Sequence, residues 1–90
     1  MNKIEKEIKI INELGLHARP ASLFVKLASS FSCEIIVEKG NEVVNGKSIM
    51  GVMMLAAARG STIKISATGD DAQEAVDALE ELIIVRTFDE

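Results

Sequence analysis

The chain is organised around the stretch GLHARP, residues 15–20, which stands directly before a helical pattern. Apolar side chains recur at spacings of three and four across residues 18–31, the period of an amphipathic helix. Pro20 fits the first turn of this helix, where the N–H that proline lacks would have no intrahelical acceptor. We therefore expect His17, the only histidine, at or just before the helix start, close to backbone N–H groups and the positive end of the helix dipole.

The residue types in this stretch suit phosphoryl chemistry. Near neutral pH much of an imidazole is uncharged and can accept a phosphoryl group on a ring nitrogen. Helix N-termini bind phosphate, and Arg19 adds a planar cation with several donors for phosphate oxygens. Gly15 permits a positive φ or a close backbone approach just upstream. A lone histidine at a helix start is more often a surface residue. Together with Gly15, Arg19 and Pro20, however, the residues alone leave phosphate chemistry and a plain surface role evenly balanced.

The composition predicts one small globular domain that spans residues 1–90. The chain is 48% hydrophobic and 27% charged, and its net charge of −4 argues against nonspecific binding to nucleic acid. One cysteine, Cys33, and one histidine are too few for an internal disulfide or a structural zinc site, so we expect no metal. No apolar run approaches the roughly 20 residues of a membrane span, and the first residues lack a signal-peptide core. These features predict a cytoplasmic protein without membrane insertion.

Short strands with alternating side chains are predicted on both sides of the first helix. Residues 4–11 alternate loosely between isoleucine and charged side chains, although Lys6 breaks the pattern. Residues 33–38 alternate as a second strand, in which Cys33 points inward as a small hydrophobe. After a turn, residues 42–45 can return as a short third strand.

The second half of the chain predicts two helices around the clearest strand. Ser48 is a good N-cap for a helix that runs to about residue 58. Residues 62–68 alternate cleanly as a strand. Asp70 caps the last helix, and Gln73 stands three residues later as in a capping box. The apolar stripe of that helix consists of Ala72, Ala75, Val76, Leu79, Leu82 and Ile83.

These elements follow one another in the order β-α-β-β-α-β-α. Because short strands cannot bury an apolar face alone, the simplest fold is a two-layer α+β sandwich, with a four-stranded antiparallel sheet and three helices on one face. The same order would also suit a ferredoxin-like fold with one helix appended.

Two segments resemble signature segments of one protein family. GLHARPA, residues 15–21, is similar to the active-site segment of HPr, the histidine-containing phosphocarrier of the bacterial phosphoenolpyruvate-dependent sugar phosphotransferase system. NGKSIMGVMML, residues 45–55, resembles the segment that carries the family's regulatory serine, at a matching distance along the chain. The similarity covers residues 4–83 and implies the open-faced β-sandwich of that family.

This resemblance implies a phosphoryl relay rather than an independent catalyst. His17 would accept a phosphoryl group on Nδ1 from phosphorylated enzyme I and pass it to enzyme IIA domains. Arg19 and the backbone N–H groups of the first turn, including that of Ala18, would bind the phosphate. Such a carrier needs no cofactor, and a monomer fits a protein that must move between partners.

Ser48 has two interpretations. By itself it is an N-cap worth about 1 kcal/mol. The resemblance implies that a dedicated ATP-dependent enzyme, HPr kinase/phosphorylase, modifies Ser48. That modification would lower phosphate acceptance at His17 and can create a co-regulator that acts with a transcriptional regulator.

The resemblance also implies a partner-binding surface on the first two helices. A methionine-rich stripe is more often core, but one short helix cannot turn so many apolar side chains inward, so some should be exposed beside the His17 loop. Phe24 is a further neighbour that could instead be wholly core. The partner-binding candidates are Ser22, Lys26, Ile49, Met50, Met53 and Met54.

Several alternatives stay open at this point. Many HPr proteins have glycine where Ala56 stands, and residues 54–60 are more similar to proteobacterial relatives, including the nitrogen-related branch of the system. Residues 47–51 are more similar to the sugar branch with kinase control. A purely regulatory phosphoprotein and a small metal or ligand module are the other functional alternatives, although the lone Cys33 argues against the module. The tail, residues 84–90, has no clear counterpart, and the sequence assigns it no role.

Overall fold

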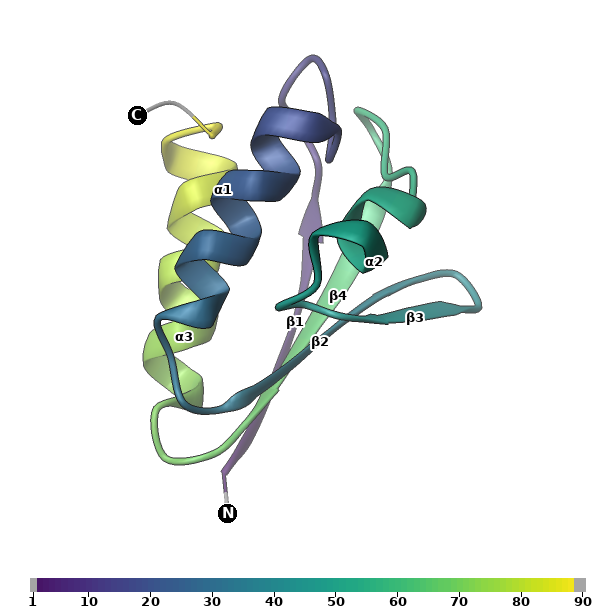
Figure 1. Ribbon diagram of the computed structural model, residues 1–90. Coiled ribbons are helices and arrows are strands. Elements are labelled where there is room, and N and C mark those ends of the chain that lie inside the picture. The colour runs from purple at the N-terminus through teal and green to yellow at the C-terminus, as the bar shows by residue number, and fades with distance from the viewer. Residues whose placement is uncertain (1, 89–90) are drawn as a thin grey trace.

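Four strands form one sheet in the computed structural model, which describes residues 2–88 (Figure 1). The strands are β1 (Lys3–Lys9), β2 (Glu34–Lys39), β3 (Glu42–Asn45) and β4 (Thr62–Thr68), all within two residues of their predicted bounds. Their order in the sheet is β1-β4-β2-β3, and each neighbouring pair is antiparallel. Because β4 and β2 are central and β1 lies at an edge, the ferredoxin-like alternative, with β1 inside the sheet, is wrong.

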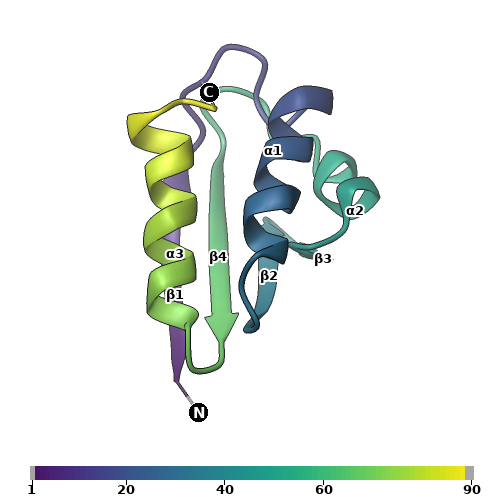
Figure 2. The same cartoon turned by 60° about the vertical axis from the view of Figure 1, so that its left-hand side comes forward.

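The helices lie on one face of this sheet (Figure 2). They are α1 (Ala18–Ser29), α2 (Ile49–Met54) and α3 (Ala72–Glu80), and α3 continues directly into a π-helical turn, η1 (Glu81–Val85). Helices α1 and α3 contact each other, while the short α2 packs against α1 and β3. The predicted two-layer α+β sandwich with four antiparallel strands and three helices is confirmed.

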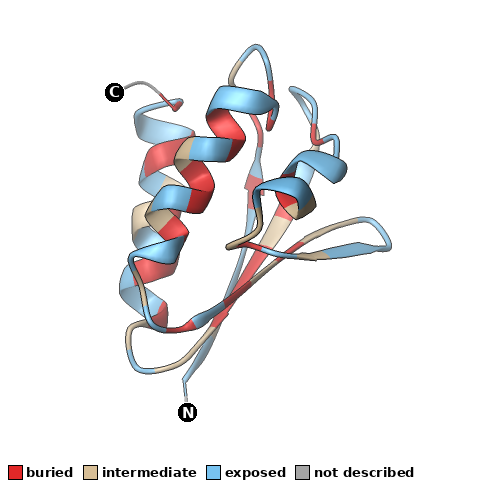
Figure 3. Cartoon of the chain, viewed as in Figure 1, coloured by how far each residue is buried: buried red, intermediate tan, exposed pale blue. Residues whose placement is uncertain are grey.

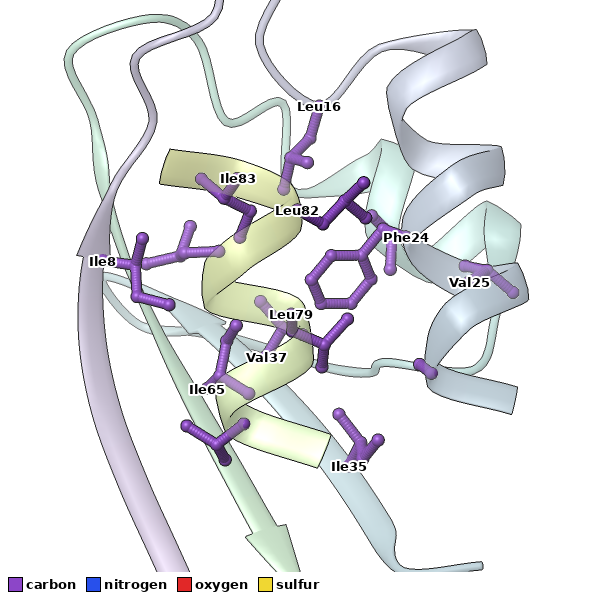
Figure 4. Close-up of a cluster of buried hydrophobic side chains, with 14 of the residues drawn as sticks. Ile8, Leu16, Phe24, Val25, Ile35, Val37, Ile65, Leu79, Leu82 and Ile83 are labelled. Carbon is purple, nitrogen blue, oxygen red and sulfur yellow. The ribbon is translucent and has the colours of Figure 1, made fainter. Parts of the chain in front are cut away.

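The core lies between the sheet and the helices (Figures 3 and 4). Alternate residues of the central strands are fully buried, among them Ile35, Val37, Ile63 and Ile65. All the residues predicted for the apolar stripe of the last helix are buried as well. Phe24 is fully buried in this cluster, so it is a core residue and not part of the surface around the His17 loop.

Lys6 explains why the alternation in β1 is imperfect. It has the same parity along the strand as Ile4 and Ile8, which pack into the core. Because β1 is an edge strand, a long side chain at this position can reach out from under the helices. Its Nζ lies 3.0 Å from Glu80 Oε2 at the end of α3. The pair is partly exposed and is therefore worth less than about 1 kcal/mol.

Two helices are shorter than the sequence predicts. Helix α1 ends at Ser29, two residues early, and Ser30 follows as its C-cap, with Oγ donating to the Leu27 carbonyl. Helix α2 ends at Met54, about four residues early. The cause is Ala56, whose φ of +49° is incompatible with a right-handed helix.

The start of α3 also differs from the prediction. Asp71, and not Asp70, is the N-cap residue, and its carboxylate makes no cap hydrogen bond. Instead its Oδ2 accepts from the Ser32 N–H at 2.8 Å and its Oδ1 accepts from the Cys33 N–H at 2.9 Å. The predicted capping box does not form, since the Gln73 amide donates to a carboxylate one turn further along α3. The carboxylate therefore joins the start of α3 to the start of β2.

The two donors hold the pKa of the Asp71 carboxyl below its usual range, the Ser32 N–H contributing most. A lowered folded-state pKa stabilises the fold above the ordinary aspartate value, and this stabilisation is lost as pH falls through the lowered value. Asp71→Asn should therefore reduce the urea midpoint at about pH 7 and narrow the gap between the midpoints at about pH 7 and about pH 3. Asp70→Asn, at the exposed neighbour, is the matched control. If the difference between the urea midpoints at the two pH values is the same in Asp71→Asn as in the parent, the Asp71 carboxylate does not cause this pH dependence.

Candidate functional site

His17 occupies the N-cap position of α1 with its side chain exposed to solvent. Its backbone is extended, and its carbonyl accepts the first hydrogen bond of the helix, from the Ala21 N–H at 2.8 Å. The imidazole makes no cap hydrogen bond. The first turn therefore presents backbone N–H groups and the positive end of the helix dipole beside an unengaged ring.

The structure brings the predicted phosphate ligands together with His17. Ala18 and Arg19 are the first two residues of α1, and both are exposed. Pro20, the next residue, is buried and anchors the turn in the core. An anion on the imidazole would thus meet the backbone of the first turn and a guanidinium carried by the same turn.

The loop before His17 is held against the chain that leaves α2. The Leu16 N–H donates to the Ala57 carbonyl at 2.9 Å. Gly15 has φ of +63°, and a Cβ atom there would collide with the same carbonyl oxygen, so this close approach requires glycine. Asn12 closes the turn, because its Nδ2 donates to the Gly15 carbonyl at 2.8 Å.

Two of these supporting residues, Asn12 and Ala57, were not predicted from the sequence. Asn12 is a typical turn residue because its side chain bonds nearby backbone groups, and that property was the available signal. Ala57 offers no signal, since it contributes only a backbone carbonyl from a distant part of the chain.

A groove of about 400 Å³ lies beside His17. It places the end of α2 and the residues that follow next to the imidazole. Ala56, whose φ of +49° turns the chain away from α2, forms one wall of this groove. The lining residues other than His17 are Leu14, Leu16, Met53, Ala56, Ala57 and Ala58.

The apolar side chains of α2 form an exposed patch, which we call the α2 patch. Met50 and Met54 are 73% and 69% exposed, and Ile49 and Met53 are exposed as well. Figure 3 shows most of the α2 ribbon in the colour of exposed residues. Only Val52 of this helix is fully buried. These side chains are therefore surface and not core, and Met53 connects the α2 patch to the His17 groove.

The remaining predicted site residues lie at the surface of α1 and at the start of α2. Ser22 and Lys26 are exposed on α1. Ser48 caps α2 as predicted, with Oγ accepting from the Gly51 N–H at 3.0 Å, and its side chain is partly exposed. Because Ser48 directly precedes the α2 patch, a charge placed on its Oγ would stand at the edge of that patch.

Two further findings concern what the described part of the chain contains. Across residues 2–88, no three His, Cys, Asp or Glu side chains gather as a metal site. No helix within the same range has the length and apolar character needed to cross a membrane. Cys33 is buried as predicted, and burial together with the nearby Asp71 carboxylate raises the pKa of its thiol.

Comparison with known proteins places the chain among close relatives. The family model described as PTS HPr component phosphorylation site matches residues 4–84. The phosphocarrier protein HPr of Neisseria meningitidis is 51% identical over 80 residues, covering 89% of this chain and 90% of that protein. The HPr-like protein Crh of Halalkalibacterium halodurans is 50% identical over 76 residues, covering 84% and 90% respectively. The crystal structure of HPr-C-His from Thermoanaerobacter tengcongensis has a TM-score of 0.91 and 53% identity, and the match covers 97% of this chain and 98% of that chain.

Proposed function

Because the chain belongs to the HPr family of phosphocarrier proteins, we propose that His17 receives a phosphoryl group from phosphorylated enzyme I and passes it to enzyme IIA domains. In the receiving step a ring nitrogen of His17, Nδ1 by family resemblance, attacks phosphorus and forms a P–N bond. The bond between phosphorus and the donor breaks, and its electron pair stays on the donor. The donating step repeats these events from His17 to the acceptor, so the protein ends unchanged.

The observation that carries this proposal is the exposed, uncapped imidazole of His17 at the N-cap position of α1. An ordinary N-cap side chain satisfies the first-turn N–H groups itself. Here the ring leaves that role open, and a phosphoryl group on the ring would take it. Ala18 and Arg19 are the proposed phosphate ligands. Because the site is open to solvent, the attraction is moderate, which suits a carrier that must release what it binds.

Partner binding is proposed for the α2 patch together with Ser22 and Lys26. The patch adjoins the His17 groove, so a partner seated on it would have its own phosphorylated or accepting group close to the imidazole. Flexible methionine side chains can adapt to several partners, as a relay between enzyme I and different IIA domains requires. We propose that the relay operates in the cytoplasm as a monomer, without nucleic acid, metal or cofactor.

Intact mass spectrometry tests the proposed function. The protein is incubated with phosphoenolpyruvate and its cognate enzyme I, with a known HPr labelled in parallel. We expect one added phosphoryl group that brief acid treatment removes, because a P–N bond is acid-labile whereas a serine phosphate ester survives. No addition to this protein, while the known HPr is labelled, would contradict the proposal.

Arg19→Ala is expected to slow phosphoryl transfer in both directions by about tenfold, since the guanidinium supplies charge-assisted hydrogen bonds to phosphate. The fold should persist because the Arg19 side chain is exposed. Rapid-quench kinetics with enzyme I and with a IIA domain measure the effect. Arg59→Ala, at an exposed arginine that follows the His17 groove residues in sequence, is the control and should match the parent. Parental kinetics in Arg19→Ala would contradict the proposal that Arg19 binds the phosphate.

We also propose that phosphorylation of Ser48 by HPr kinase/phosphorylase regulates the relay and can direct the protein to a transcriptional regulator. A phosphate at a helix N-terminus is tolerated by the fold, but it places about two negative charges at the edge of the α2 patch. Docking should therefore suffer more than folding.

Ser48→Asp and Ser48→Asn separate the charge from the cap. Asp and Asn are about equally good N-cap residues, so both variants should have nearly the same urea midpoint. Only Ser48→Asp adds charge beside the α2 patch, and it should slow transfer from enzyme I by roughly fivefold or more. Equal transfer rates in the two variants would argue against a charge effect on docking.

A purely regulatory phosphoprotein is the alternative function, and the similarity to an HPr-like protein Crh is the observation that favours it. In that case Ser48 governs partner choice and His17 is little used. A kinase assay on Ser48→Ala combined with growth of a His17→Ala strain on a transported sugar discriminates the two. Unimpaired growth of that strain on every transported sugar would favour the regulatory role or the nitrogen-related branch.

A further inference from the structure

The segment that follows α3 has an unusual backbone. Helix α3 passes into the π-helical turn η1, in which the Arg86 N–H reaches the Glu81 carbonyl at 2.9 Å. The chain then reverses, and the Phe88 N–H donates to the Leu82 carbonyl at 2.8 Å. Turns of this i→i+5 kind occur at the C-termini of helices. The sequence gives the tail, residues 84–90, no role, and the structure describes residues 84–88 of it.

Two consecutive non-glycine residues in this segment have positive φ values, Thr87 at +48° and Phe88 at +61°. Such a conformation is disfavoured for residues with a Cβ atom and persists only where surrounding contacts determine it. The compensating contact is the Phe88 side chain, which is 6% exposed and belongs to the hydrophobic core cluster. The backbone is thus held in a strained turn because the aromatic ring is buried.

Phe88 is buried at the His17 end of the molecule. Figures 1 and 2 show that α3 ends at the same end of the molecule as the β1–α1 loop and the start of α1, and that the chain turns inward there. Thr87 and Phe88 line a groove of about 240 Å³ together with residues from both sides of His17. Those residues are Asn12, Glu13 and Leu14 before it, and Arg19 and Pro20 after it.

We propose that Phe88 is a positioning residue for phosphoryl transfer, which sets the placement of Arg19 and the first turn of α1 relative to His17. The buried Phe88 lines the same groove as Arg19 and as Pro20, the buried anchor of that turn, so it forms the wall that these two residues face across the groove. Preorganised phosphate ligands raise a transfer rate, and the residue that holds them in place need not touch the reacting atoms itself. This inference rests on the proposed phosphocarrier function.

Phe88→Ala, Phe88→Leu and Phe31→Ala test the proposal. Phe31 is a partly buried phenylalanine that follows the opposite end of α1, so its truncation weakens the core without altering the His17 end. Phe88→Ala should reduce the rate constant of transfer from phosphorylated enzyme I by on the order of tenfold, with affinity for enzyme I unchanged within about twofold. Phe88→Leu, which restores a large buried apolar side chain at this wall of the groove, should recover most of the rate. Phe31→Ala should transfer within about twofold of the parent.

A second measurement does not depend on phosphoryl transfer. Amide hydrogen exchange of residues 12–20 should accelerate in Phe88→Ala relative to Phe31→Ala at matched global stability. Faster exchange without any labelling of the parent protein would mean that Phe88 orders the loop and that the proposed function has failed. Parental transfer and exchange in a folded Phe88→Ala, or an equal loss of transfer in Phe31→Ala, would overturn the positioning role. If Phe88→Ala does not fold, the less severe truncation Phe88→Val takes its place in both measurements, with Phe88→Leu again the variant expected to recover the rate.

Discussion

His17→Ala is expected to abolish acid-labile phosphorylation of the protein while leaving its fold intact. The reaction requires a ring nitrogen as nucleophile, and the sequence holds one histidine. The substitution should be structurally mild because the imidazole is exposed and makes no cap hydrogen bond. Intact mass after incubation with phosphoenolpyruvate and enzyme I measures acceptance, and the urea midpoint measures the fold.

Ser48→Ala is the matched control for this experiment. It removes the other proposed phosphorylation site and should still take up one acid-labile phosphoryl group. It should also lower the free energy of unfolding by about 1 kcal/mol, because the Gly51 N–H loses its acceptor. An acid-labile phosphoryl group on His17→Ala would mean that another residue accepts it, and would contradict the proposed relay through His17.

The parts of this structure that follow from local signals could be predicted from the sequence. Alternation predicted the bounds of β4, which buries Ile63 and Ile65, and the turn signal at residues 39–41 predicted the returning strand β3. His17, Arg19 and Pro20 were placed at a helix start because the relevant chemistry lies within one turn of chain. The exposure of the α2 patch followed from its size, since a helix as short as α2 cannot bury so many apolar side chains.

The parts that depend on distant contacts could not be predicted in this way. A carboxylate at the start of α3 was expected to cap its own helix, yet the Asp71 oxygens bind N–H groups 38 and 39 residues earlier in the chain. The tail had no clear counterpart in the family and was assigned no role. The burial of Phe88 depends on the turn that follows α3, which the sequence does not indicate. Backbone carbonyls such as that of Ala57 have no sequence signature at all.

The support of the His17 loop therefore depends on long-range backbone geometry that the motif does not reveal. Two segments are in contact there, the loop that ends at His17 and the chain that leaves α2. Both contacts of the loop are made to one backbone carbonyl, that of Ala57. Gly15 lies directly over this carbonyl, and Leu16 binds it. This arrangement makes Gly15 the position at which a single added methyl group should do most damage.

Gly15→Ala can be compared with a matched substitution that has strain but no collision. Gly40 has φ of +60°, almost the value at Gly15, and a Cβ atom added there would meet nothing within 4 Å. Gly40→Ala should therefore lower the free energy of unfolding by only about 1 kcal/mol, the cost of a left-handed backbone for alanine. If Gly15→Ala loses more free energy of unfolding than Gly40→Ala, the difference measures the collision with residues 57 and 58.

We expect Gly15→Ala to lower the free energy of unfolding by about 3 kcal/mol or more, measured by urea denaturation. The added Cβ would collide with the Ala57 carbonyl oxygen and lie 2.9 Å from the Ala58 Cα, and neither atom is the flexible end of a side chain. The loop cannot retreat without breaking the Leu16 hydrogen bond to the same carbonyl, so relief of the collision displaces the residue that precedes His17. Phosphoryl transfer should fall in Gly15→Ala even where the protein remains folded, and stay parental in Gly40→Ala. Equal stability losses in the two variants would mean that the loop yields freely, and that the chain leaving α2 does not fix the position of the imidazole.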